Sequence, residues 1–333
     1  MVYSNNSFFA KPLYGIWSRG KEIEKINLEI SLYFAKHHKR FIQLFKEDYQ
    51  QINKKKIYSN QDRAHIRKTI WVLSHILKFK YVNNKLEHSA EAMEIKGYLY
   101  KISDDFSDLN INILAEGALA RGNDPQSFKV SLKALEHTDP KIRADACWAI
   151  GFGKGNQAAL HKACYVALAG LQNDHKDAII QQFLHALGHI SKHVNNIDTK
   201  QTIVDTIIKN NLLSSPTAKI RRNSAIVLIR SNLHTAVIID ILFDMAKKDT
   251  APTVREWITR LSYLIEDERR VGLWFHQLND ADSTVRMTSL VNIRKYVDKL
   301  TFDQKNIIKK YIEEEHELKL KNFANELLSE RLK

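Results

Sequence analysis

One block of sequence recurs five times in this chain, and its spacing limits the folds that the chain can adopt. The clearest copy is DPKIRADACWAIG at Asp139–Gly151. Every copy carries a branched aliphatic residue at the same place, and these anchors are Ile142, Ile179, Ile220, Val254 and Val285. Successive anchors lie 37, 41, 34 and 31 residues apart. This period is too short for a domain and too long for a heptad, but it accommodates two antiparallel helices with their turns, the unit of an α-solenoid.

The composition of the chain also favours helices. Its 333 residues include 11 Gly and 5 Pro, which are few for a fold built on many tight β-turns. No glycine-rich turn joins a strand pattern to a helix pattern, which argues against doubly wound α/β folds. We therefore predict an all-α fold.

The downstream copies of the block share a pattern as well as a period. They read HKDAIIQQFLHALG from His175, PTAKIRRNSAIVLI from Pro216, APTVREWITRLSYL from Ala251 and DSTVRMTSLVNIRKY from Asp282. A Pro or polar turn, an aliphatic–Arg pair, and then small and apolar residues at helical spacing resemble the HEAT-repeat family. The similarity is closest to the short bacterial-type repeats of phycobilin lyase-like proteins. The matching arginines are Arg143, Arg221, Arg255 and Arg286, whereas the second copy has Ile180 at this position.

This resemblance covers about residues 107–300 and speaks to architecture rather than activity. It implies a right-handed α-solenoid of HEAT-like helical hairpins. In that family the turn acid and the helix arginine bridge neighbouring repeats, which implies structural roles for Asp139 and Arg143. We expect a basic helical amino-terminal region at 1–105, HEAT-like repeats at 106–300 and C-terminal capping helices at 301–333.

The region before the repeats is predicted to be helical from its apolar spacing. Apolar residues at three- and four-residue intervals predict helices over 21–51, 61–81 and 90–101. The SDD sequence at Ser103–Asp105 is expected to end the third helix and to cap the next. From Leu109 small residues alternate with aliphatic ones, and GNDP at Gly122–Pro125 predicts a turn.

The positive charge of the chain is concentrated near its amino terminus. The net charge is +13, and residues 1–100 hold 18 Lys and Arg against 9 Asp and Glu. Clustered bases with interleaved aromatic residues are typical of nucleic-acid contacts, but the same pattern also arises when charges solvate the outer face of a helix. The candidate partner-binding residues of this region are Lys54, Lys55, Lys56, Arg63 and Arg67.

Three further candidates for partner binding lie within the repeats. Arg221 and Arg222 form a basic pair at the start of a repeat helix, although inter-repeat salt bridging is the favoured role of the repeat arginines. Trp257 follows Arg255 and Glu256 and is the more plausible exposed tryptophan, whereas Trp148 is assigned to the core or an inner groove.

Three histidines lie four residues apart in HALGHISKH, at His185, His189 and His193. A pair at this spacing can bind a transition metal, but no glutamate follows as in HExxH and no nearby acid completes a ligand set. We expect solvated or partner-facing histidines, with metal binding as the open alternative. No cofactor is predicted. The chain contains no Ser–His–Asp signature, P-loop or dinucleotide fingerprint, so an enzyme is not the favoured class.

The expected function is a non-catalytic adaptor that binds a protein partner along the concave face of the solenoid. The alternative is nucleic-acid binding, with HEAT-like alkylpurine DNA glycosylases as a catalytic precedent, although no active-site motif of theirs maps onto this chain. Cys147 and Cys164 form no CxxC pair, which fits a reducing compartment. The sequence also lacks a convincing signal peptide or transmembrane helix, so we expect a cytoplasmic protein without a membrane partner.

Overall fold

The computed structural model describes residues 59–329 apart from gaps at 87, 106 and 125–127, together with six separate residues between 37 and 47. The predicted helix over 21–51 falls almost entirely outside these residues, and so do Lys54, Lys55 and Lys56. The described part contains fifteen α-helices, labelled α4 to α18, and no β-strand. The prediction of an all-α fold is therefore confirmed for this part of the chain.

The helices before the repeats follow the predicted pattern with one correction. Helix α4 spans Asn60–Ile76, begins at a capping box formed by Ser59, and continues as a π-helix, η2, over Leu77–Val82. Helix α5 spans Ala90–Asp105. The expected break at Ser103–Asp105 was wrong, because these residues belong to the last turn of α5. Asp108 instead caps α6, Leu109–Arg121, by accepting backbone N–H bonds from Asn110 and Ile111.

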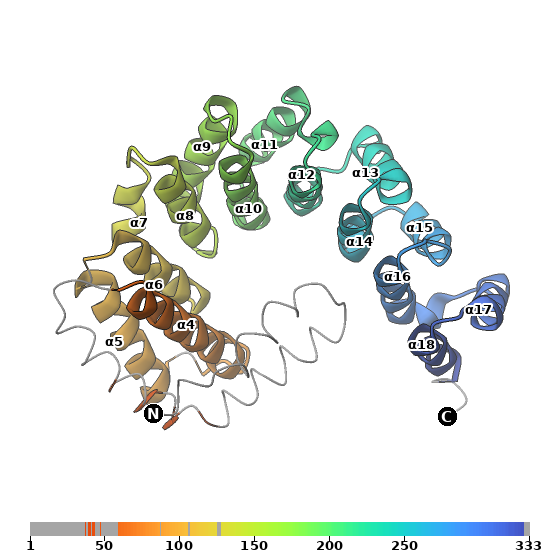
Figure 1. The fold of residues 1–333 in the computed structure, drawn as a ribbon, viewed down its shortest axis with the longest axis horizontal. Coiled ribbons are helices and arrows are strands. Elements are labelled where there is room, and N and C mark those ends of the chain that lie inside the picture. Colours follow the sequence, from red (N-terminus) through yellow and green to blue (C-terminus); the bar gives the residue numbers. More distant parts are fainter. Residues whose placement is uncertain are drawn as a thin grey trace. The chain divides into compact units, whose positions relative to one another are not determined.

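The helices form two compact units, one within Leu28–Leu233 and the other within His234–Lys333. In the first unit α6, α8, α10 and α12 pack in succession, and α4 and α5 pack against α6. Helices α7, α9 and α11 form a second row, in which α7 packs on α6 and α8, and α9 packs on α8 and α10 (Figure 1). The new bounds are α7 Lys129–Ala134, α8 Pro140–Ile150, α9 Gln157–Asn173, α10 Asp177–His193, α11 Ile197–Lys209 and α12 Ala218–Ser231.

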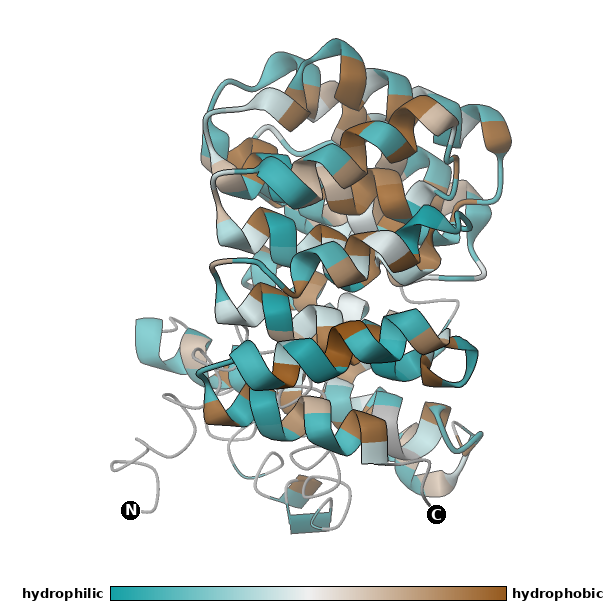
Figure 2. Ribbon diagram, turned by 90° about the vertical axis from the view of Figure 1, so that its right-hand side faces the viewer, coloured by the Kyte–Doolittle hydropathy of each residue, from teal (hydrophilic) through white to brown (hydrophobic). Residues whose placement is uncertain are grey.

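The second unit repeats this two-row arrangement. Helices α14, α16 and α18 pack in succession, while α13 packs on α14 and α15, and α17 packs on α18. The helix bounds are α13 Ala236–Lys248, α14 Pro252–Leu261, α15 Arg269–Gln277, α16 Ser283–Lys295, α17 Phe302–Glu314 and α18 Leu318–Ser329. Hydrophilic and hydrophobic segments alternate along the helices (Figure 2), as expected when each helix buries one stripe of its surface.

The five copies of the repeated block fall on α8, α10, α12, α14 and α16, so each copy supplies one helix of the same row. Small residues in the block allow close packing, and Ala144, Ala146 and Ala149 are buried in α8. Between α9 and α10 the approach is closer still, because a Cβ atom at Gly170 would overlap the ring of Phe183. One step from a copy of the block to the next therefore spans two α-helices.

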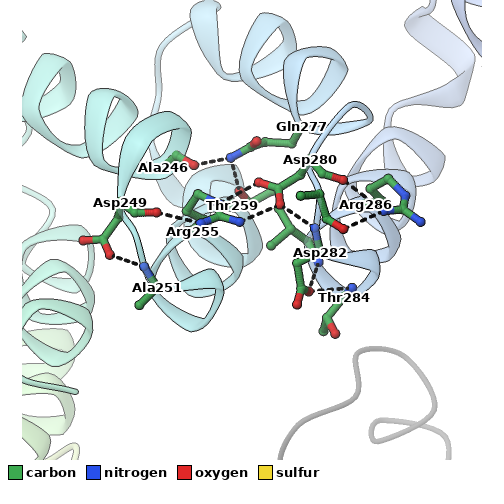
Figure 3. Close-up of polar contacts among 12 residues, drawn as sticks. Ala246, Asp249, Ala251, Arg255, Thr259, Gln277, Asp280, Asp282, Thr284 and Arg286 are labelled. Carbon is green, nitrogen blue, oxygen red and sulfur yellow. Dashed lines mark hydrogen bonds and ion pairs between the residues drawn. The ribbon is translucent and has the colours of Figure 1, made fainter. Parts of the chain in front are cut away.

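A shared turn precedes each of these five helices. The side chain two residues before the N-cap residue accepts the backbone N–H of the N-cap, as Asp280 does from Asp282 at 2.8 Å (Figure 3). Four of the five copies carry an arginine four residues after the N-cap residue. The guanidinium of this arginine donates to a backbone carbonyl of the same turn. Thus Arg286 donates to the carbonyl of Asp280 at 2.9 Å. The equivalent pairs are Arg143 with His137, Arg221 with Ser215 and Arg255 with Asp249.

Two of the repeat arginines also bridge to the following turn. Arg255 donates from Nε and Nη2 to the two carboxylate oxygens of Asp280, each at 2.7 Å (Figure 3). Arg286 donates in the same way to Glu315, at 2.8 and 3.2 Å. All four of these side chains are largely buried. The structural role expected of the repeat arginines is therefore seen between neighbouring repeats of the second unit.

The bridging role expected of Asp139 was wrong. Its carboxylate accepts the backbone N–H of Lys141 at 2.9 Å and so caps its own helix, α8. An aspartate at an N-cap position has a short side chain that bonds the free N–H groups of the first turn. Arg143 donates to His137 and Thr138, which also belong to the turn before α8.

Candidate functional site

Of the predicted partner-binding residues, the five that the structure describes do not gather at one place. Arg63 on α4 forms an ion pair with Asp108, with Nε and Oδ2 3.0 Å apart. Arg221 is engaged in the turn before α12. Trp257 belongs to the second unit and lies under the guanidinium of Arg260, 5.0 Å from Cζ to the ring centroid. The charge of Arg67 acts on Asp145 of α8, and that of Arg222 acts on His185 of α10, one of the groups described next.

A ladder of four side chains runs along the row of helices α6, α8, α10 and α12 in the first unit, and three of its members, Arg121, Phe152 and His189, are in ring contact. Its members each lie thirteen residues after an N-cap residue: Asp108 to Arg121, Asp139 to Phe152, Lys176 to His189, and Thr217 to Arg230. The guanidinium carbon of Arg121 lies 4.1 Å from the centroid of the Phe152 ring. Phe152 in turn lies 4.4 Å from the ring of His189. Because α6, α8, α10 and α12 pack in succession, one position in the repeat generates a continuous row.

Further aromatic rings adjoin this ladder. Trp148 contacts Phe152 edge to face with centroids 4.9 Å apart, and its ring lies 5.6 Å from Cζ of Arg121. The rings of His185 and His189 lie 5.1 Å apart on α10. On α4, the rings of Trp71 and His75 lie 4.1 Å apart. Both tryptophans are partly exposed.

Six basic residues surround these rings: Lys78, Arg121, Lys154, Lys192, Arg222 and Arg230. We call the six bases, the four histidines His75, His185, His189 and His193, and the rings of Trp71, Trp148 and Phe152 the cationic aromatic face. Arg230 donates to the carbonyl of Gly188 at 3.0 Å, and Arg222 donates to the side chain of Asn223 at 3.1 and 3.0 Å. The acceptors of these bonds, a backbone carbonyl and a side-chain amide oxygen, are neutral.

The pKa values of the four histidines report the charge of this surface. Loss of hydration, followed by the charges of Arg121 and Lys78, lowers the pKa of His75 to about 3. Loss of hydration also comes first for His189, whose pKa falls to about 2 under the further influence of His185 and Arg230. The pKa values of His185 and His193 fall to about 4, by loss of hydration and then by charge. Because His185 is exposed, screening by water weakens both effects there.

The lysines of the face show the same repulsion. Loss of hydration, and then the charges of Arg121, Lys192 and Lys154, lowers the pKa of Lys78. The pKa of Lys192 is lowered by desolvation and then by Arg230 and Lys154. Among the described residues, the charges that lower these pKa values come from Arg, Lys and His side chains. The face is therefore a concentration of like charge at neutral pH, with imidazoles that remain uncharged.

Two carboxylates in the same unit do not neutralise this charge. Glu116 is buried and accepts the backbone N–H groups of Val130 and Ser131 at 2.7 and 2.6 Å, which caps the short helix α7. Asp145 lies on α8, where burial raises its pKa while the nearby charges of Lys141 and Arg67 lower it. Neither acid acts on the histidines of the face.

The face does not offer a metal site or a reactive thiol. Within the part of the chain that the structure describes, no three His, Cys, Asp or Glu side chains are placed to hold a metal ion. Cys147 and Cys164 are free and buried, and burial raises the pKa of Cys164 to about 12. What the arrangement can do is bind anionic groups by charge and flat groups by stacking.

Sequence reasoning missed most of this face, including Lys78, Arg121, Lys154, Lys192 and Arg230. These residues are single bases on four different helices and in the turn between α8 and α9, so none of them forms a cluster in the sequence. Part of the face can be found by aligning the helices at their N-cap residues. Counting from each N-cap residue aligns Arg121, Phe152, His189 and Arg230, whereas the block that defines the repeats ends before this position.

Comparison with known proteins assigns no family. No protein-family model matches the chain, and a search of curated proteins found no relative. Among the described residues, no helix combines the length and apolar character needed to cross a bilayer.

Proposed function

We propose that the protein binds nucleic acid through the cationic aromatic face of its first unit. The observation that supports this most strongly is a concentration of basic groups, because the charges that lower the pKa values of the four histidines, Lys78 and Lys192 come from Arg, Lys and His side chains. Mutual repulsion of this kind costs folding free energy, and bound phosphates offset that cost. Phosphate binding also releases counterions from the nucleic acid, which adds affinity at low salt.

The rings within the face favour nucleic acid over an acidic protein. Charge alone serves either ligand, and the expected protein-binding adaptor remains the competing hypothesis. The ladder, however, interleaves guanidinium groups with aromatic rings, as at Arg121 and Phe152. Nucleic acids combine phosphates with flat bases and so use both kinds of group, whereas a carboxylate-rich peptide uses only the first.

We also infer that the helix pairs form a right-handed α-solenoid of HEAT-like repeats, as the sequence resemblance implied. The regular turns and the two rows of helices within each unit support this architecture. Small-angle scattering tests it, because a compact globule of this length has a radius of gyration of about 20 Å and a solenoid has a larger one. The cytoplasm is the proposed location, supported by two cysteines that form no disulfide.

The proposed function is tested by fluorescence anisotropy with labelled DNA, labelled RNA and a labelled poly-glutamate peptide across a salt series. We expect nucleic acids to bind at low salt and to dissociate steeply as salt rises. Binding of the acidic peptide alone would favour the protein-binding adaptor and reject nucleic acid as the ligand.

A further inference from the structure

We propose that the nucleic acid bound at the cationic aromatic face is single-stranded, with unpaired bases stacked on Trp148 and Trp71 and phosphates held by the surrounding bases. This inference rests on the proposed function and names the class of nucleic acid. It is supported by the aromatic rings that lie among the cations, because a ligand bound only through its phosphates would not need these rings.

The rings and cations alternate from one helix to the next. Arg121 of α6 contacts the rings of Phe152 and Trp148 beyond α6, and its charge also acts on His75 of α4. On α10, the ring of His189 adjoins both Phe152 and the ring of His185, and the charge of Arg230 acts on both histidines. A strand lying across these helices meets stacking surfaces and positive charges in turn.

Trp148 is held in place before any ligand arrives. A Cβ atom at Gly117 would lie 3.2 Å from Cζ3 of Trp148, so the glycine leaves just enough room for the indole against α6. Phe152 contacts the same indole edge to face. Trp148 nevertheless remains partly exposed. A fixed and accessible ring loses little conformational entropy when a base stacks on it.

The low pKa values of the histidines support the same ligand. At neutral pH the imidazoles are uncharged, so they act as flat stacking groups rather than as additional cations. In a duplex the bases are paired and stacked on one another, so their faces are not available to protein rings. Unpaired bases expose a π-face, and stacking on an aromatic residue contributes about 1–3 kcal/mol per base.

The test compares one labelled oligonucleotide as a single strand with the same sequence in a duplex, using the full chain and matched variants. Trp148→Ala is expected to weaken single-strand binding roughly 5- to 100-fold, the affinity equivalent of one lost stack. Trp148→Phe keeps a stacking ring, and we expect it to retain most of the affinity. Trp257→Ala, which removes a partly exposed tryptophan from the second unit, is the control and is expected to bind like the wild type.

Tryptophan fluorescence provides a second readout. Single strands should quench the emission of the wild type, and the quenching should diminish in Trp148→Phe even if Trp148→Ala does not fold. The inference is overturned if the duplex binds as tightly as the single strand and Trp148→Ala behaves like Trp257→Ala; the proposed function would then still stand. If neither nucleic acid binds at low salt, the proposed function itself fails.

Discussion

The guanidinium carbon of Arg121 lies 4.1 Å from the centroid of the Phe152 ring. Arg121 is the last residue of α6, and Phe152 lies two residues beyond the end of α8. Phe152 also contacts His189 of α10. Side-chain contacts thereby connect α6, the end of α8 and α10, in addition to the apolar packing of these helices. This connection places cations and rings side by side, which is the basis of the proposed function.

Loss of the Arg255–Asp280 ion pair should destabilise the second unit strongly. Arg255→Ala leaves a largely buried carboxylate without its partner, and breaking such a pair costs about 3 kcal/mol. Urea denaturation measures this loss. Lys248→Ala is the control, because it removes an exposed pair with Asp244 and should cost less than about 0.5 kcal/mol. Equal losses in the two variants would contradict the structural role of Arg255.

Alanine at two helical glycines should have opposite effects on stability. Gly170→Ala places a methyl group against the ring of Phe183 and should lower the free energy of unfolding by about 1–3 kcal/mol. Gly97 lies within α5, and a Cβ atom there meets nothing within 4 Å. Gly97→Ala should therefore raise stability by up to about 1 kcal/mol through helix propensity. Thermal unfolding of the two variants, followed by circular dichroism, distinguishes these signs.

Acidification should destabilise the protein through the histidines of the cationic aromatic face. The pKa of His189 is about 2 in the folded protein and about 6.5 when unfolded. The unfolded chain therefore binds more protons between these values, and the free energy of unfolding falls as pH drops below about 6.5. The slope for one such imidazole is at most about 1.4 kcal/mol per pH unit. The groups that face His189 and lower its pKa are His185, Arg230, Arg121 and His193.

His189→Gln removes this contribution, so its stability should depend less steeply on pH between 6.5 and 4.5 than that of the wild type. The matched control is His276→Gln, a histidine of α15 in the second unit. Denaturant unfolding at several pH values provides the measurement. If the free energy of unfolding depends on pH equally steeply in His189→Gln and in the wild type, the pKa of His189 is not lowered by burial and by the charges of the face.

The sequence predicted the all-helical fold better than the site because the two depend on different information. Each copy of the block starts at a turn and carries its own apolar stripe, so local pattern was enough to locate α8, α10, α12, α14 and α16. The cationic aromatic face gathers residues from several helices and from the turn after α8, and Arg121, Phe152, His189 and Arg230 share a position but no single residue type. The prediction from sequence relied on clusters such as Arg221–Arg222. Arg221, however, donates to the carbonyl of Ser215 in the turn before its own helix.

The salt dependence of nucleic-acid binding tests the central claim most directly. Lys154→Glu/Lys192→Glu reverses two exposed charges of the face, and Lys133→Glu/Lys209→Glu reverses two exposed charges on α7 and α11 of the same unit. Each phosphate contact to a single strand contributes about 0.7 to the slope of log K against log salt concentration. We predict that the first variant loses at least about tenfold in affinity at low salt and about 1.4 in slope, while the second binds like the wild type. Equal affinity and equal slope in both variants would show that nucleic acid does not bind at this face.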